Sequence, residues 1–116
     1  MSYVAPNAGL LRKAKAYIEL ELFSSELSPD RIAKSIGVSR RKLYYLFEAE
    51  GGVVRYIQNA RLLRARTALA DPDRSYRVKE AAFDHGFTSE AHFSRSFKRL
   101  FGFNASEAAE VVLTPS

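Results

Sequence analysis

Residues 79–102 have the sequence KEAAFDHGFTSEAHFSRSFKRLFG, and residues 31–52 have the sequence RIAKSIGVSRRKLYYLFEAEGG. In both segments an alanine stands four residues before a glycine, which is followed by an apolar residue and a serine that can cap a helix. Glycine suits a chain that leaves a helix in a left-handed conformation. A short helix, such a turn and a second helix form the helix-turn-helix pattern. The sequence therefore predicts two of these motifs.

The two copies match position by position, apart from one extra residue in the turn of the second copy. The matching positions are Ala33, Gly37, Val38, Ser39, Leu43, Phe47 and Gly52 in the first copy, and Ala82, Gly86, Phe87, Ser89, Phe93, Phe97 and Gly102 in the second. A single match is weak evidence, because helical hairpins are common. A repeat of the pattern within 116 residues is much stronger evidence.

The rest of the chain also has the periodicity of α-helices, and no run alternates strongly enough to predict a strand. A first helix carries an apolar stripe made of Leu11, Ala14, Ile18 and Leu22. A long helix from Val53 to Ala70 follows the first motif and ends at the Asp-Pro-Asp sequence of residues 71–73.

Helix starts are predicted from capping residues at Ser28, Ser39, Ser75, Thr88 or Ser89, and Asn104. We therefore predict an all-α fold of seven helices, with two helix-turn-helix subdomains joined by a long linker helix. The first subdomain is expected at residues 1–50, the linker helix at 51–71 and the second subdomain at 72–116.

Composition limits the class of protein. The chain has 18 Lys plus Arg against 13 Asp plus Glu, a net charge of +5 and no cysteine. This basic excess permits a polyanionic partner without requiring one. The lack of cysteine excludes disulfides and fits a reducing compartment. Because no membrane span or secretory signal is visible, we expect a cytoplasmic protein with no membrane partner.

The sequence holds no pattern that predicts catalysis. We find no nucleophile with a matching base, no paired carboxylates and no phosphate-binding loop. His85 and His92 lie seven residues apart with no cysteine and no matching acidic partner, so we expect no metal site. His85 is expected to pack or cap beside the turn. We predict no enzymatic activity, no catalytic residues and no cofactor.

The second helix of each motif has an apolar side and an outward side when it is drawn at about 100° per residue. With Leu43 toward the core, Leu46 and Phe47 join it, and the outward residues are Arg41, Tyr44 and Tyr45. With Phe93 toward the core, Phe97 and Leu100 join it, and the outward residues are Ala91, Arg95 and Lys98, flanked by His92, Ser94 and Arg99. These side chains are of the kinds that contact base edges and phosphates.

The predicted linker helix is compatible with binding along a DNA duplex. Residues 53–70 would span about 27 Å as an α-helix. Successive major grooves on one side of B-DNA are about 34 Å apart. The length permits two DNA-binding helices near one duplex turn apart, but it does not require them.

Over nearly its whole length the chain resembles the DNA-binding domain of the AraC/XylS family of bacterial transcription regulators. The resemblance is carried by IAKSIGVSRRKLYYLF, by RYIQNARLLRARTAL and, above all, by HGFTSEAHFSRSFKRLFG. It implies two helix-turn-helix subdomains bridged by a long helix. It also implies that helices at about 39–48 and 89–100 enter adjacent major grooves of double-stranded DNA and bind it sequence-specifically.

The resemblance also assigns expected roles to residues. Base contacts are expected from Arg41, Tyr44, Tyr45, Glu90, Ala91, His92, Ser94 and Arg95. Phosphate contacts, or positioning of the same helices, are expected from Ser39, Arg40, Arg61 and Lys98. Double-stranded DNA is the expected partner, which would place the protein at the nucleoid, and RNA polymerase is a further candidate.

Two features differ from the family pattern. The segment NASEAAE has alanines where the family usually has a Ser-Pro cap followed by an aromatic residue and an arginine. Many members also carry an N-terminal effector-binding domain, which we do not find in this sequence. The chain is therefore expected to be either a short stand-alone member or an excised C-terminal domain.

A second class of function is a helical module whose basic face meets an acidic protein surface. The tandem signature favours DNA. Binding through several phosphates would weaken by orders of magnitude between low and moderate salt, which separates the two hypotheses.

Overall fold

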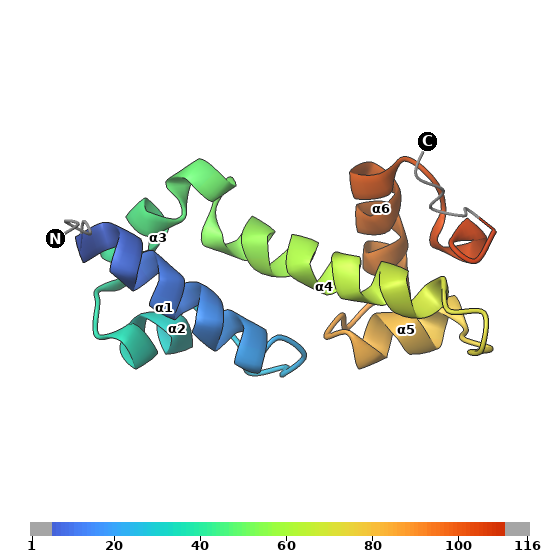
Figure 1. Ribbon diagram of the computed structural model, residues 1–116, viewed down its shortest axis with the longest axis horizontal. Coiled ribbons are helices and arrows are strands. Elements are labelled where there is room, and N and C mark those ends of the chain that lie inside the picture. Colours follow the sequence, from blue (N-terminus) through green and yellow to red (C-terminus); the bar gives the residue numbers. More distant parts are fainter. Residues whose placement is uncertain (1–5, 111–116) are drawn as a thin grey trace, which may run out of the picture. The chain divides into compact units, whose positions relative to one another are not determined.

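The computed structural model describes residues 6–110, and the chain is all α over that range, with no β-strand among these residues (Figure 1). The helices are α1 (Pro6–Leu20), α2 (Pro29–Ile36), α3 (Arg40–Leu46), α4 (Val53–Leu69), α5 (Val78–Asp84) and α6 (Glu90–Phe101). Two single 3-10 turns follow α3 and α6, namely η1 (Glu48–Glu50) and η2 (Ala105–Glu107). The predicted all-α fold is confirmed.

The chain divides into two compact units, residues 1–58 and residues 59–116. The division falls within α4, which is continuous over 17 residues. Val53 and Ile57 of α4 are buried in unit 1, and Leu62, Ala65 and Leu69 are buried in unit 2. The predicted subdomain boundaries at residues 50/51 and 71/72 stay predictions.

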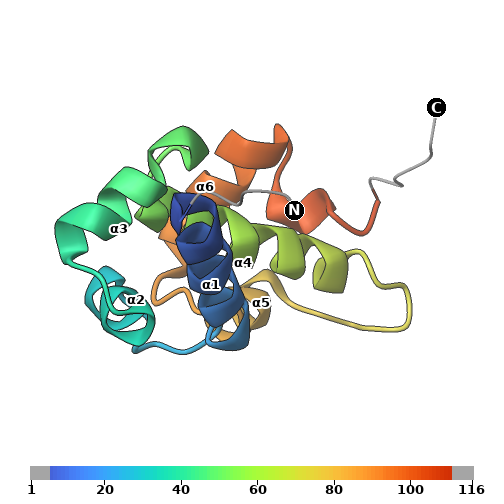
Figure 2. The ribbon, with the colours of Figure 1, turned by 60° about the vertical axis from the view of Figure 1, so that its left-hand side comes forward.

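Unit 1 packs α1 against α2 and α3, as Figure 2 shows. Its buried side chains are mainly aliphatic and include the predicted residues Ala14, Ile18 and Leu22 of the first helix. Leu11, the fourth residue of that stripe, is half-buried. Phe47 is fully buried, and its ring centroid lies 5.3 Å from that of Tyr56 on α4. This core fixes the apolar side of α3.

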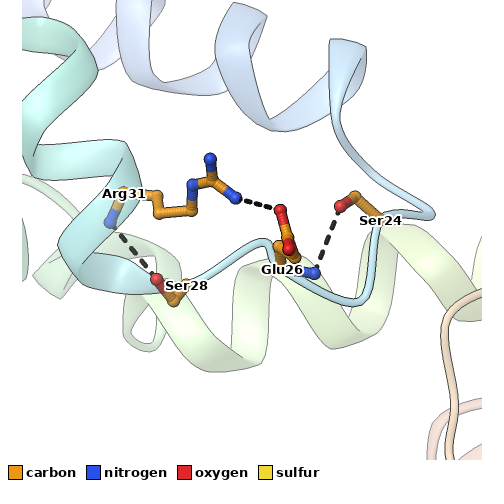
Figure 3. Close-up of polar contacts among 4 residues, drawn as sticks. All are labelled: Ser24, Glu26, Ser28 and Arg31. Carbon is orange, nitrogen blue, oxygen red and sulfur yellow. Dashed lines mark hydrogen bonds and ion pairs between the residues drawn. The ribbon is translucent and has the colours of Figure 1, made fainter.

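The connection from α1 to α2 is held by polar contacts (Figure 3). The Ser24 hydroxyl accepts a hydrogen bond from the Glu26 backbone N–H at 3.1 Å. Ser28 caps α2 as predicted, because its hydroxyl accepts from the Arg31 N–H at 3.2 Å. The Arg31 guanidinium donates to the Glu26 carboxylate at 2.5 Å, and this hydrogen bond raises the pKa of Arg31.

The predicted repeat is visible in the backbone hydrogen bonds. Gly37 and Gly86 have left-handed φ values of 74° and 87°. After each glycine the next N–H donates to a carbonyl five residues earlier, from Val38 to Ala33 and from Phe87 to Ala82, both at 3.0 Å. Both turns therefore end their first helix in the same way.

The core of unit 2 is built around phenylalanine rings. Phe87 lies 5.0 Å from Phe93, Phe93 lies 5.8 Å from Phe97, and Phe97 lies 4.6 Å from Phe101, all between ring centroids. The Arg66 guanidinium of α4 stacks over Phe101 and Phe103, at 4.7 and 5.2 Å from their ring centroids. The positive charge of the Arg66 guanidinium is attracted electrostatically to the faces of these two rings.

Two predicted helix starts differ in the structure. α5 begins at Val78 after Arg77, not after Ser75. Tyr76 is half-buried against the core of unit 2, its hydroxyl donates to the Asp84 carboxylate, and Arg77 has an extended backbone before the helix begins. The expected seventh helix is only the turn η2. There the Asn104 amide donates to the Glu107 carboxylate at 2.8 Å, and no side chain caps the backbone.

Candidate nucleic-acid interface

The outward side of α3 carries the three residues predicted from its sequence. Ser39 caps the helix, because its hydroxyl accepts from the Lys42 backbone N–H at 3.0 Å. Leu43, Leu46 and Phe47 are buried, which anchors one side of the helix. The opposite side exposes Arg41, Tyr44 and Tyr45.

Arg40, a predicted phosphate ligand, contacts one of these tyrosines. Its Nε and Nη2 groups donate to the Tyr44 hydroxyl at 3.3 and 3.2 Å. The guanidinium carbon lies 5.6 Å from the Tyr44 ring centroid, and Nη1 lies 3.6 Å from the Asp30 carboxylate of α2. The hydrogen bond to Tyr44, and then the charges of Tyr44 and Asp30, raise the pKa of Arg40. Arg40 therefore connects α2 to a predicted base contact of α3.

Lys42 makes a parallel connection between α3 and α1. Its ammonium donates to the side-chain oxygen of Asn7 at 2.7 Å. The same ammonium lies 5.2 Å from the Tyr45 ring centroid. One face of the Tyr45 ring is thus covered by a cation from its own helix.

The outward side of α6 carries the second predicted set. Ser89 caps the helix by accepting from the His92 N–H at 3.2 Å, and Phe93 and Phe97 are fully buried. The exposed residues are Glu90, Ala91, His92, Arg95 and Lys98, while Ser94 is half-buried. The His92 ring lies 5.8 Å from the ring of Phe87, so the turn residue helps to orient it. Leu100 was expected on the core side, but it is 41% exposed because Phe101 and Phe103 pack there instead.

Arg61, the remaining phosphate candidate, is half-buried on α4 against the second turn. Its Nη1 donates to the Gly86 carbonyl at 3.4 Å. Burial lowers the pKa of Arg61, although an arginine keeps its charge at neutral pH. A Cβ atom added at Gly86 would lie 2.8 Å from Arg61 Nε. Gly86 therefore leaves the space that Arg61 occupies.

Comparison with known proteins identifies the family. A family model described as a helix-turn-helix domain matches residues 32–110. A solved AraC-type DNA-binding domain-containing regulator from Chromobacterium violaceum is 31% identical, with a TM-score of 0.83 over 97% of this chain and 100% of that one. The chain belongs to the AraC/XylS family.

Curated members of the AraC/XylS family are similar in sequence. XylDLEGF operon transcriptional activator 3 of Pseudomonas putida is 37% identical over 74% of this chain and 27% of its own length. Transcriptional activator NphR of a Rhodococcus species is 37% identical over 79% of this chain and 27% of its own length. The chain thus spans about a quarter of the length of these two curated relatives.

The side chains that contact Arg40 and Lys42 in this AraC-type domain were not predicted from the sequence. The spacing of Arg40 and Tyr44 is a visible signal, because residues four apart on a helix are neighbours. Asp30 and Asn7 come from other helices, and no local pattern connects them to α3. Ser96, buried at 4% exposure on α6, was also not predicted to face inward.

The described residues form neither a metal site nor a membrane span. Within residues 6–110 no group of three or more His, Asp or Glu side chains is placed to hold a metal ion. No helix in that range is both long and apolar enough to cross a membrane. His85 is buried beside the turn, and its Nδ1 lies 2.7 Å from the Ala81 carbonyl, so the predicted packing role is confirmed.

Proposed function

We propose that this chain binds double-stranded DNA sequence-specifically and serves as the DNA-binding part of a transcription regulator. The observation that carries the proposal is the pair of capped helices α3 and α6. Each is anchored by buried apolar residues and exposes basic and hydrogen-bonding side chains on the other side. Family membership and the net charge of +5 support the same function.

In the proposal, α3 and α6 enter adjacent major grooves. Linker helix α4 has 17 residues, a length of about 26 Å at 1.5 Å per residue, which is near the groove spacing of about 34 Å. The two helix-turn-helix subdomains would be residues 1–50 and 72–116, with residues 51–71 as the linker.

The residues proposed for contacts are those that the family resemblance implies, and the chemistry of most of them fits that role. Arginine can donate a bidentate pair to guanine, and serine, histidine and tyrosine can form single hydrogen bonds to base edges. Base contacts are proposed for Arg41, Tyr44, Tyr45, Glu90, Ala91, His92, Ser94 and Arg95. Phosphate contacts or positioning roles are proposed for Ser39, Arg40, Arg61 and Lys98.

The wider setting is also proposed. The relatives are named transcriptional activators and are about four times as long as the matched segment. We therefore propose RNA polymerase as a second partner and an N-terminal effector domain in the working regulator. We also propose a cytoplasmic location at the nucleoid and no enzymatic activity.

In vitro selection from randomised duplexes, followed by footprinting, tests the proposal. We expect one selected sequence with two protected segments about one helical turn apart. Affinity should fall by orders of magnitude between low and moderate salt. Arg12, exposed on α1 outside the candidate interface, gives a charge-matched control: Arg12→Ala should bind nearly as the parent does, whereas Arg41→Ala should not.

Two results would contradict parts of this proposal. A single short footprint would mean that only one motif binds DNA. Recovery of no preferred duplex would favour the alternative, a module for an acidic protein surface.

A further inference from the structure

The contact between Arg40 and Tyr44 determines which hydrogen bonds the tyrosine can make. Two N–H groups of one guanidinium donate to a single hydroxyl oxygen, at 3.3 and 3.2 Å. A tyrosine hydroxyl has two lone pairs that accept and one proton that it donates. Arginine has donors only. The two N–H groups of Arg40 therefore occupy the lone pairs of the Tyr44 hydroxyl oxygen. The hydroxyl proton of Tyr44 remains for donation to another acceptor.

The direction in which Tyr44 faces is also constrained. The guanidinium lies over the ring, and Asp30 of α2 holds the guanidinium from its other side at 3.6 Å. Tyr44 is 39% exposed, so its hydroxyl edge can still reach a partner outside the protein. Among residues 6–110 we find no acceptor for the hydroxyl proton of Tyr44.

Resting on the proposed function, we propose that Arg40 is a positioning residue that makes Tyr44 a hydrogen-bond donor toward DNA. Tyr44 then selects a base that presents an acceptor in the major groove. Guanine, adenine and thymine each present one there, whereas cytosine presents only its N4 amine, which is a donor. The first motif should therefore reject cytosine at the base that Tyr44 contacts.

A phosphate role for Arg40 makes a different prediction. Phosphate contacts carry no sequence information. Lysine can supply the charge for such a contact, but it cannot reproduce the planar arrangement of two donors. The variant Arg40→Lys thus separates the two roles, and Arg12→Lys on α1 is its matched control.

The first experiment needs no DNA. In the free protein, ¹⁵N signals of the Arg40 Nε–H group are compared between the parent and Tyr44→Phe. We expect the signal to shift and its exchange with water to accelerate in the variant, with the Arg12 signal unchanged. An unchanged Arg40 signal would overturn the inferred contact, whatever the DNA-binding result.

The second experiment measures affinity for the selected duplex and for duplexes with cytosine at each position of the first half-site. The parent should reject cytosine at one position. In Tyr44→Phe and in Arg40→Lys, the ratio of affinities for the selected duplex and the cytosine duplex should fall by about three- to tenfold. This change corresponds to the free energy of one hydrogen bond. The double variant should lose no more than either single one, because both changes remove the same interaction.

Three outcomes would overturn the inference. Arg40→Lys could select as the parent does, or the two losses could add, or Arg40→Ala could weaken all sequences alike and lower the salt slope. If the parent selects no duplex at all, the proposed function fails instead, and the NMR comparison still decides the Arg40–Tyr44 contact. Both residues are exposed, so the variants should fold, which thermal unfolding checks.

Discussion

The turn between α2 and α3 and the turn between α5 and α6 share their backbone hydrogen bonds but differ in the side chains around them. The first turn leads into a helix whose outward side has two tyrosines, each beside a cation. The second leads into a helix that exposes Glu90, Ala91 and His92. The repeated motif thus fixes the backbone of the turn that leads into the second helix. The residues on the outward side of that second helix differ between the two copies.

The cores of the two units differ as well. Unit 1 buries mainly aliphatic side chains with one phenylalanine, Phe47. Unit 2 buries Phe87, Phe93 and Phe97 in ring contact, next to small residues such as Ala81 and Ala82. The core of unit 2 therefore depends more on contacts between aromatic rings than the core of unit 1 does.

The largest effect is expected from Phe93→Ala. This side chain is fully buried, so its loss should lower the free energy of unfolding by about 3–5 kcal/mol. Thermal unfolding with backbone NMR should show loss of structure in unit 2. Phe83→Ala is the control, because Phe83 is 48% exposed. Equal losses for the two variants would show that ring burial does not decide stability.

The second-largest effect is expected from alanine substitutions at the two turn glycines, Gly37 and Gly86. Alanine at a left-handed position costs about 1–2 kcal/mol. A Cβ at Gly37 would meet nothing within 4 Å, whereas at Gly86 it would lie 2.8 and 2.9 Å from Arg61 atoms. Gly86→Ala should therefore lower the free energy of unfolding more than Gly37→Ala in denaturant titrations. Equal costs would mean that Arg61 moves aside freely.

Arg95→Ala tests whether α6 contacts bases. Arg95 is exposed on the outward side, so its loss should weaken binding by about 1–3 kcal/mol and relax preference at one base pair. Competition between the selected duplex and random DNA measures both changes. If Arg95→Ala retains the parent's preference, then Arg95 contacts no base.

Lys98→Ala tests a contact that carries no sequence information. It should weaken binding to all duplexes alike and reduce the slope of log affinity against log salt by about one unit. Affinities across a salt series give the slope. A loss confined to the selected sequence would assign Lys98 to a base instead of a phosphate.

The smallest effect concerns tyrosine ionisation. Burial and the hydrogen bond to Asp84 raise the pKa of Tyr76 to about 12. The folded state therefore favours the neutral phenol, and this contribution to stability is complete below about pH 10 and lost as pH rises through about 12.

Ultraviolet titration should show one tyrosine that ionises late, and Tyr76→Phe should remove that step. In unit 2 the hydroxyl donates to a carboxylate, whereas in unit 1 the Tyr44 hydroxyl accepts from Arg40. A late step that persists in Tyr76→Phe would assign it to another tyrosine.

Local features of the fold could be predicted from the sequence. The turn glycines and the caps Ser28 and Ser39 act within a few residues and were predicted correctly, and Ser89 was one of the two residues predicted as the cap of α6. The cap predicted at Ser75 was wrong, because α5 begins after Arg77 and the half-buried Tyr76 packs against the core of unit 2 before it. Packing between separate elements overrode the local signal.

The candidate site could be predicted only in part. Helical periodicity placed Arg41, Tyr44, Tyr45 and Arg95 outward, and the structure exposes all four. The roles of these residues toward DNA stay predictions. The contacts of Asp30 with Arg40 and of Asn7 with Lys42 join separate helices, so they needed the tertiary structure.

The packing of Arg61 against Gly86 has a consequence for sequence variation among homologous domains. Even asparagine, which tolerates a left-handed backbone, would bring a Cβ into the space held by the Arg61 side chain. Positions 61 and 86 should therefore vary together, with a larger residue at 86 accompanied by a shorter one at 61. Position 37 has open space around it, so it should accept asparagine without any matching change elsewhere.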